Sequence, residues 1–189
     1  LNFVKMQAAG NDYILVDCLK EPVSCPESLT VRLCEQHFGA GAEGLALMVP
    51  DEEADARMIL FNRDGTEGGT GGNAIRCVAK YLCDRGLGKH SGDRDGVEEI
   101  TIRAAGGIHT LYPVRRFGEV RAVTADMGKV DFSPAAVPCR IRAEKVINIP
   151  AKVAGGKYRV TCLSVGNPHC VVFNDDVDIL DLADLGPKF

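Results

Sequence analysis

The fold of this chain is set by one stretch, Asn62-Arg63-Asp64-Gly65-Thr66-Glu67-Gly68-Gly69-Thr70-Gly71-Gly72-Asn73-Ala74-Ile75-Arg76-Cys77. It begins with an Asn-x-Asp-Gly turn, continues as a glycine-dense loop and then enters a helix. Glycine has no Cβ, so the loop can adopt positive φ and approach a ligand closely. A glycine loop that leads into a helix N-terminus forms a site for an anion such as phosphate or carboxylate. From the spacing alone, a surface loop followed by a core helix is an equal alternative.

The residues after the loop are predicted to form a helix that ends at Gly86. Asn73 is its expected N-cap, because an asparagine side chain can accept from an unpaired backbone N–H. The apolar residues fall on one broad side, as in a helix packed against a core: Ala74, Ile75, Cys77, Val78, Tyr81 and Leu82. The loop has neither the Gly-Lys-Ser/Thr of a phosphate loop nor the spaced glycines of a dinucleotide site, so a carboxylate is the preferred ligand.

The composition describes an ordinary globular protein. The 189 residues suffice for one domain or two small ones, with 46% hydrophobic and 25% charged residues. The net charge of −4 and the lack of a basic cluster argue against a nucleic-acid partner. No apolar run is long enough to cross a bilayer, and the segment that begins at Leu1 lacks a signal-peptide core. We therefore expect a cytoplasmic protein with no membrane partner.

The chain has eight cysteines, none in a Cys-x-x-Cys pair, so a zinc site or a thioredoxin-like motif is not indicated. Without a secretory signal they are expected to be reduced and mostly buried. They are Cys18, Cys25, Cys34, Cys77, Cys83, Cys139, Cys162 and Cys170. The sequence predicts no metal site.

Apolar patterning predicts strands over most of the remaining chain. A further helix is predicted over Val31–Phe38, capped by Ser28 or Thr30. A polar loop is expected over Lys89–Gly96.

A second domain is expected to begin near Phe117, which divides the chain into residues 1–116 and 117–189. Within it, Arg140–Ile149 is predicted to be a strand and Val177–Leu185 a short helix.

Two segments share the pattern strand, Gly-Asn, buried strand: Ala9-Gly10-Asn11-Asp12-Tyr13-Ile14-Leu15-Val16 and Val165-Gly166-Asn167-Pro168-His169-Cys170-Val171-Val172. Chance is the alternative for so short a match. If the repeat is real, the counterpart of Gly71 falls beyond Phe189. The second half would then lack its own central helix and leave apolar faces uncovered. We therefore expect the chain to be part of a longer protein.

Six groups of residues carry a family resemblance: Phe3-Val4-Lys5-Met6 with Gly10-Asn11-Asp12, Gly39-Ala40-Gly41-Ala42-Glu43-Gly44-Leu45, Asn62-x-Asp64-Gly65-Thr66-Glu67, Gly72-Asn73-Ala74-Ile75-Arg76-Cys77, Gly166-Asn167-Pro168-His169 and Leu185-Gly186-Pro187-Lys188-Phe189. Together these motifs resemble the diaminopimelate epimerase family. They occur in the family's order along the whole chain, and jointly they are highly specific.

The resemblance implies an α/β (mixed α+β) fold of two pseudo-symmetric domains, each a β-sheet wrapped around one central helix, with the second domain incomplete in this chain. It implies an isomerase of lysine and cell-wall biosynthesis that interconverts LL- and meso-diaminopimelate. It also implies independence from pyridoxal phosphate, metal or any other cofactor. Diaminopimelate would be the small-molecule partner, and a homodimer is compatible with the family.

The resemblance also implies the site residues. One cysteine from each domain moves the α-proton, and the developing carbanion requires electrostatic stabilisation in a closed site. His169 would tune a catalytic thiol, although a turn histidine bonded to its own backbone is the alternative. Glu43 would line the loop and Arg76 would brace the helix. The substrate's carboxylate and amino groups would be held by Asn11, Asn62, Gly72, Asn73 and Asn167.

The chain departs from the family at the catalytic position. Where the family has Met-Cys-Gly-Asn, this chain has Thr70-Gly71-Gly72-Asn73, so Gly71 stands at the position of the first catalytic cysteine. The second would lie beyond Phe189, so the chain as given is expected to be inactive. Cys77 lies about one turn into the helix on its apolar side and is expected to be a core thiol.

Two alternatives to an epimerase remain. One is a non-catalytic amino-acid-binding homologue that keeps the asparagines and has lost the thiols. The other is a sister isomerase, such as a proline racemase-like or phenazine-biosynthesis-type enzyme. Gly72-Asn73 in place of Gly-His argues against the racemase, and the Asn62-x-Asp64-Gly65 run fits the epimerase better than the phenazine type.

Overall fold

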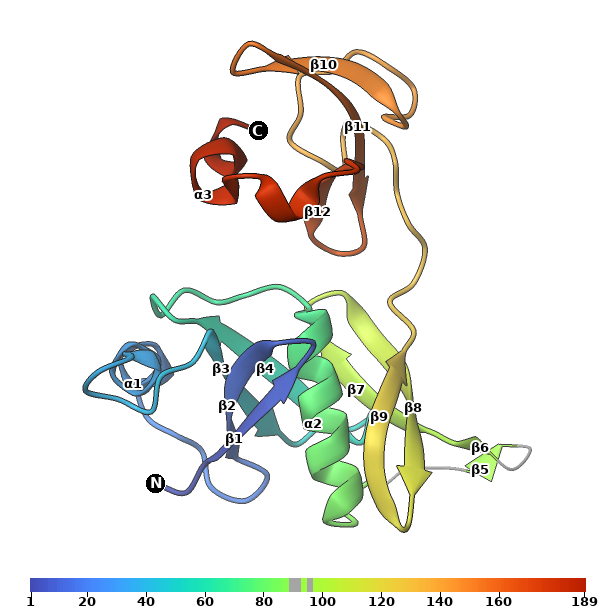
Figure 1. Ribbon diagram of the computed structural model, residues 1–189. Helices are drawn as coiled ribbons and strands as arrows, with labels where there is room; N and C mark the ends of the chain where they lie inside the picture. Colours follow the sequence, from blue (N-terminus) through green and yellow to red (C-terminus); the bar gives the residue numbers. More distant parts are fainter. Residues whose placement is uncertain (89–92, 95–96) are drawn as a thin grey trace. The chain divides into compact units, whose positions relative to one another are not determined.

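The computed structural model describes residues 1–88, 93–94 and 97–189, which form two compact units (Figure 1). The first unit is Leu1–Met127 and the second is Gly128–Phe189. The boundary lies later than the expected one after residue 116. Residues 119–125 form a strand that pairs with the preceding strand of the first sheet, so they belong to the first unit. The predicted loop Lys89–Gly96 lies mostly outside the described residues.

The first unit is built on a mixed seven-stranded sheet in the order β1-β2-β3-β4-β7-β8-β9. Two neighbouring pairs, β2 with β3 and β4 with β7, are parallel, and the others are antiparallel. The strands are β1 (Val4–Ala8), β2 (Asn11–Asp17), β3 (Gly44–Val49), β4 (Ala56–Asn62), β7 (Ile100–Ala104), β8 (Gly107–Arg116) and β9 (Glu119–Ala125). A separate ribbon pairs β5 (Asp93–Arg94) with β6 (Val97–Glu98).

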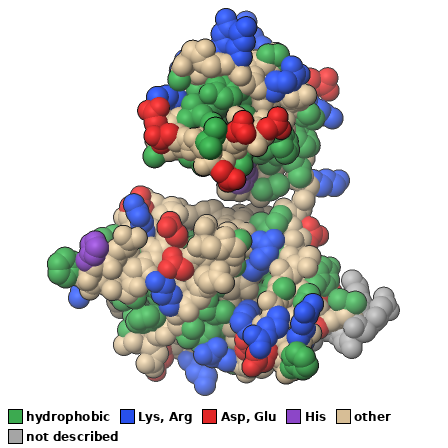
Figure 2. Space-filling view, viewed as in Figure 1, with side chains coloured by type: hydrophobic (Ala, Val, Ile, Leu, Met, Phe, Trp, Pro, Cys, Tyr) green, Lys and Arg blue, Asp and Glu red, His purple; other side chains and the backbone are tan. Residues whose placement is uncertain are grey.

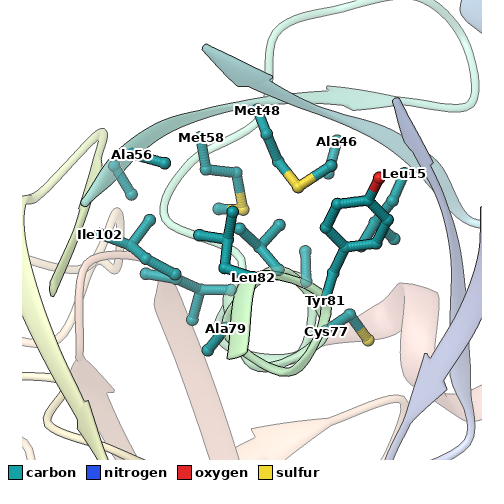
Figure 3. Close-up of a cluster of buried hydrophobic side chains, with 14 of the residues drawn as sticks. Leu15, Ala46, Met48, Ala56, Met58, Cys77, Ala79, Tyr81, Leu82 and Ile102 are labelled. Carbon is teal, nitrogen blue, oxygen red and sulfur yellow. The ribbon is translucent and has the colours of Figure 1, made fainter. Parts of the chain in front are cut away.

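The sheet curls around the helix α2 (Gly72–Asp84), as Figure 1 shows. Alternate strand residues point to one face, so Leu15, Met48 and Met58 meet the apolar side of α2 (Figure 3). The buried residues of the helix are Ala74, Ile75, Cys77, Val78, Ala79, Tyr81 and Leu82. The predicted central helix is therefore confirmed, and Cys77 is a core thiol. Burial raises the pKa of Cys77 to about 11.

The opposite face of the sheet carries a second core, which includes Ile14, Leu45 and Phe61. Burial on both faces explains why these strands are continuous apolar runs in the sequence. The helix α1 (Pro26–Cys34) lies on this side and contributes Cys34 to the core.

The predicted position of α1 was wrong at both ends, because the helix begins at Pro26 and ends at Cys34. Proline is favoured in the first turn of a helix, where its missing N–H has no partner to lose. Ser28 and Thr30 do not cap the helix. Their hydroxyls donate to the backbone carbonyls of Cys25 and Pro26, at 3.1 and 2.7 Å.

The second unit is a three-stranded antiparallel sheet in the order β10-β11-β12. Its strands are β10 (Ile149–Val153), β11 (Gly156–Ser164) and β12 (Pro168–Val172). They are followed by η1 (Val177–Ile179), α3 (Leu182–Leu185) and η2 (Gly186–Lys188). Val137, Val146, Val160 and Cys162 form its small core.

Two predictions for the second unit were wrong. The strand predicted over Arg140–Ile149 begins only at its last residue, Ile149, which opens β10. Before it the backbone forms isolated hydrogen bonds instead of a ladder: Val146 N donates to Phe132 O and Val146 O accepts from Cys162 N. The helix predicted over Val177–Leu185 is divided into η1 and α3. Asp181 interrupts it by capping α3, where its side chain accepts from Asp184 N at 3.0 Å.

Three further properties concern only the described part of the chain. No helix there is long and apolar enough to span a membrane. No group of three or more His, Cys, Asp or Glu side chains among those residues is arranged to hold a metal ion. All eight cysteines are free thiols, of which Cys25 and Cys170 are exposed.

Acidic and basic side chains are interspersed on the visible face of each unit (Figure 2).

Shortening a helix side chain that faces the sheet should destabilise the first unit. Leu82 is fully buried, and we expect Leu82→Ala to lower the free energy of unfolding in urea by about 2–5 kcal/mol through lost burial and a residual cavity. Val31→Ala, at a side chain that is 46% exposed, is the control and should cost far less. Equal losses in the two variants would contradict a core centred on α2.

Candidate functional site

The strand register brings several of the predicted site residues to one end of the first sheet. Tyr13 pairs with Gly44, and Gly44 pairs with Asn62 across the neighbouring strand. At this row β2 and β3 begin and β4 ends. Asn11 opens β2 and Glu43 precedes β3, so both lie at the same end as Asn62.

The helix α2 begins near the same end, because its N-cap Gly71 lies against Leu60, two residues before the end of β4. Its N-cap is Gly71, with φ 57° and ψ 72° in the left-handed region, and Ile75 N donates to Gly71 O at 2.9 Å. The prediction of Asn73 as N-cap was wrong, since the turn requires a backbone conformation that glycine adopts most readily. Asn73 is the second residue of the helix. By their position, the N–H groups of Gly72, Asn73 and Ala74 have no acceptor within the helix.

The glycine loop is held by its own hydrogen bonds. Gly65 N donates to Asn62 O at 2.8 Å and Gly68 N donates to Leu60 O at 2.7 Å. The side-chain amide of Asn62 donates to Thr66 Oγ1 at 3.0 Å, and that hydroxyl donates to Asp64 Oδ1 at 2.6 Å. The hydrogen bonds from Thr66 hold the pKa of Asp64 below its usual value.

This network decides what Asn62 can offer to a ligand. One N–H of its side-chain nitrogen donates to Thr66, which leaves the second N–H as a donor and Oδ1 as the acceptor. An exposed amide oxygen suits an ammonium group, whereas the free N–H groups of α2 suit a carboxylate. The two halves of an amino acid thus find complementary groups at the same end of the sheet.

Gly71 has no room for a side chain in this conformation. A Cβ at this position would lie 2.4 Å from Cδ2 of Leu60, a buried side chain of the core around α2. At Gly72 a Cβ would lie 3.3 Å from the guanidinium of Arg76 and 3.5 Å from Cε of Met127. Leu60 therefore occupies the space that a side chain at position 71 would need.

Arg76 contacts the residue that follows the first glycine loop, and Glu43 belongs to the second glycine loop, residues 39–44. Arg76 Nη1 donates to Gly72 O, so the predicted brace of the helix is confirmed. Glu43 is exposed, and its backbone N–H donates to Asp12 O at 3.0 Å. Lys5 pairs with Asp12 at 2.8 Å and donates to Ala40 O at 3.2 Å, which ties the second glycine loop to β2. The hydrogen bond from Lys5 lowers the pKa of Asp12.

His109 is a buried residue next to the loop that sequence reasoning missed. It is 9% exposed, its Nδ1 lies 3.1 Å from the backbone oxygen of Asp126, and its Nε2 has no hydrogen-bond partner among the described residues. A Cβ on Gly106 would lie 3.4 Å from that Nε2 and 3.0 Å from Oγ1 of buried Thr70. His109 and Thr70 thus both lie against Gly106. No motif surrounds His109 in the sequence, so only the fold reveals this neighbour.

Asn167 and His169 belong to the second unit, where they lie close together. His169 Nε2 lies 3.0 Å from Asn167 Oδ1, which accepts the ring N–H in this pairing. Both residues are exposed, in the turn and first residues of β12. His169 therefore contacts a side chain instead of its own backbone.

The two segments of the internal repeat take the same local form. Each is the turn of an antiparallel hairpin, β1 with β2 and β11 with β12. The glycine of each turn has positive φ, 88° at Gly10 and 96° at Gly166. The repeated Gly-Asn pair thus reflects the same need for a left-handed residue at the turn.

Adding a methyl group at position 71 should strain the loop. We expect Gly71→Ala to lower the free energy of unfolding by more than about 2 kcal/mol, because the new Cβ meets Leu60 and the residue has positive φ. Gly69→Ala is the matched control, since a Cβ there meets nothing within 4 Å. Adding Leu60→Ala to Gly71→Ala should recover part of the strain. Denaturant titration of the unchanged chain, the two single variants and the double variant measures their free energies of unfolding. Equal losses of stability for Gly69→Ala and Gly71→Ala would refute the described contact with Leu60.

Comparisons with known proteins agree with this architecture. The sequence model of the diaminopimelate epimerase family matches residues 3–133. The diaminopimelate epimerase of Pelotomaculum thermopropionicum is 40% identical over 190 residues, and that of Synechocystis is 41% identical over 199 residues. The alignments cover 99% and 100% of this chain but 65% of each relative, so the chain spans about two thirds of their length.

A solved structure shows the same fold at low sequence identity. The hydroxyproline epimerase from Agrobacterium vitis, with bound trans-4-OH-L-proline, has a TM-score of 0.61 and 16% identity. The similarity covers 97% of this chain and 52% of that one. The expected α/β fold is confirmed, and the chain belongs to the diaminopimelate epimerase family.

Proposed function

We propose that this chain provides the carboxylate-binding half-site of a diaminopimelate epimerase, and that with Gly71 it is inactive as given. The observation that carries the proposal is the start of α2. Three N–H groups without helical partners, on Gly72, Asn73 and Ala74, open the helix at the end of the glycine loop that follows Asn62. A helix N-terminus attracts an anion through these donors and through the helix dipole.

The arrangement suits the chemistry of an α-amino acid. The carboxylate accepts from the first turn of α2, which also stabilises negative charge that develops when the α-proton leaves. The ammonium group is held by the side-chain oxygen of Asn62. Asn11 and Asn73 extend the half-site at the same end of the sheet. No cofactor is required in this proposal, because the helix N-terminus and the asparagines supply the electrostatic stabilisation.

Asn167 and His169 are the substrate-binding and positioning residues that the family resemblance implies in the second unit. The contact between His169 Nε2 and Asn167 Oδ1 fixes the asparagine, so its NH₂ group is the part free to donate to the substrate. His169 would then act as a positioning residue for Asn167 in addition to tuning a thiol.

Gly71 occupies the position that the family resemblance gives to a catalytic cysteine. Cys77 is no substitute, because it is 2% exposed and burial raises its pKa to about 11. A thiol with so high a pKa is almost entirely protonated at neutral pH and is a poor base. Proton abstraction by a thiolate at position 71 is therefore absent from this chain.

The same observation supports a second candidate, a protein that binds an amino acid without reacting with it. Leu60 packs into the space where the side chain at position 71 would lie, so the loop accommodates the glycine without a void. The half-site for the carboxylate is complete without a thiol. Binding and exchange measurements together separate the two candidates.

Binding of meso-diaminopimelate by isothermal calorimetry tests the half-site. We expect Asn62→Ala to weaken binding by about 10- to 150-fold, since a hydrogen bond to a charged group contributes about 1.5–3 kcal/mol. Asn2→Ala is the matched control, because Asn2 precedes β1 at the opposite end of the sheet. Unchanged affinity of the Asn62 variant, or equal loss in both variants, would contradict the proposed site.

Proton exchange in heavy water tests the role of position 71. We expect this chain to incorporate no deuterium at the α-carbons of diaminopimelate, because glycine stands at the position of the first catalytic cysteine. Proton NMR follows the exchange. A full-length family member with a cysteine at this position provides the positive control. Measurable exchange by this chain would refute the assignment of Gly71 as the missing base. Binding without exchange by a longer protein that retains Gly71 would favour the second candidate.

A further inference from the structure

Three cysteines of the second unit lie together on one side of its sheet. Cys162 lies in β11, Cys170 lies in β12 and Cys139 packs against the small core from the preceding loop. Cys162 and Cys170 are direct partners in the antiparallel register of the two strands. Directly opposed residues project to the same face of a sheet, so the two thiols face each other.

The hydrogen-bond pattern places this pair at the closer of the two kinds of antiparallel position. Cys162 N donates to Val146 O at 2.9 Å, and Ser164 N donates to Asp131 O at 2.8 Å, so both N–H groups point away from β12. Cys162 and Cys170 therefore form a non-hydrogen-bonded pair. In such pairs the Cα atoms are about 4.5 Å apart, which lies within the range of about 4.4–6.8 Å found for disulfides.

The two thiols differ in their surroundings. Cys162 is 5% exposed and lies beside the pair of Val160 and Val172, whereas Cys170 is exposed to solvent. Burial, followed by the neighbouring thiols of Cys170 and Cys139, raises the pKa of Cys162 to about 11. A protonated, buried thiol reacts slowly with a dissolved oxidant, so oxidation begins at the accessible sulfur of Cys170.

We propose that Cys162 and Cys170 form a reversible cross-strand disulfide when the protein meets a peroxide. In the first step the Cys170 sulfur attacks the peroxide O–O bond, becomes a sulfenic acid and releases water from hydrogen peroxide. In the second step the Cys162 sulfur attacks the sulfenic sulfur, forms the S–S bond, loses its proton and releases a second water. The two cysteines are oxidised by two electrons, and one peroxide is reduced.

The modification acts on the hairpin that carries Asn167 and His169. The disulfide would join β11 and β12 next to the turn at Gly166, and fix the register of Leu163 opposite His169. It would restrict opening of the hairpin in the same way that any cross-link restricts the unfolded state. The proposal goes beyond the proposed function, and its chemistry does not depend on which ligand the protein binds.

Peptide mapping of the whole chain after treatment with hydrogen peroxide tests the proposal. Cys162 and Cys170 fall in one tryptic peptide, residues 160–188, whereas Cys139 falls in another, residues 130–140. After free thiols are blocked with iodoacetamide, we expect peptide 160–188 to lack two hydrogens and to carry no label. Chymotryptic cleavage after Leu163 should leave its two parts joined until dithiothreitol separates them.

Variants distinguish this pair from the other thiols. Cys170→Ser should abolish the internal disulfide, and Cys139→Ser should leave it intact. Cys25 is an internal control, because it is exposed but has no described cysteine opposite it in a strand. It should remain labelled by iodoacetamide or stop at a singly oxidised thiol under the same treatment.

Three outcomes would overturn the proposal. One is a tryptic peptide 130–140 linked to 160–188, which would make Cys139 the partner. Another is a sulfinic acid at Cys170 with a labelled Cys162, which would show that the two sulfurs do not meet. The third is full labelling of both cysteines after peroxide at concentrations that oxidise Cys25.

Discussion

The packing of α2 against the inner face of the curved sheet is the interaction on which the first unit depends. The buried side of the helix meets strand residues from β2, β3, β4, β7 and β8, and without it these apolar side chains would have no cover. Once the helix is fixed along this face, its N-terminus is fixed at the end of the sheet where β2 and β3 begin. The position of the proposed half-site at the start of α2 therefore follows from core packing more than from the loop itself.

Leu60 connects that core to the glycine loop. Its side chain packs with the residues around α2, while its Cδ2 occupies the space beside Gly71 and its Cγ lies 3.2 Å from the Cβ position of Gly68. Its backbone oxygen also accepts from Gly68 N. Because Leu60 contacts both regions, a change in the loop alters the packing of the core, and a change in the core alters the start of α2. This coupling explains how the conformation of a loop rich in glycine can be set by its surroundings.

Two pairs of neighbouring polar or reactive side chains lie on a single hairpin of the second unit. Its turn carries Asn167 and His169, whose side chains contact each other, and its strands carry the opposed thiols of Cys162 and Cys170. Antiparallel register places the two thiols opposite each other across the strands. Asn167 and His169 instead contact each other because they are two residues apart along the turn. The same hairpin form recurs at Gly10 in the first unit, where the chain turns between β1 and β2.

Much of the architecture was predictable from the sequence. The apolar side of α2, the buried strands and the family were all indicated by residue patterns, because periodicity and clustered motifs are properties of the chain itself. The wrong predictions concerned segments whose structure depends on pairing with other parts of the chain. Residues 140–148 form only isolated backbone hydrogen bonds, such as the one from Cys162 N to Val146 O, and no ladder. The strand β9 belongs to the first sheet because it pairs with β8.

The sequence by itself determined that a glycine loop leads into a buried helix, and that Gly71 stands where the family resemblance places a cysteine. Only the tertiary structure decided that Gly71, instead of Asn73, caps the helix, that Leu60 fills the space beside it, and that His109 and Thr70 both lie against Gly106. It also decided that Cys162 and Cys170 face each other. The physical reason is that these relations join residues distant in sequence, or depend on backbone angles that packing selects, and neither is encoded in local residue preference.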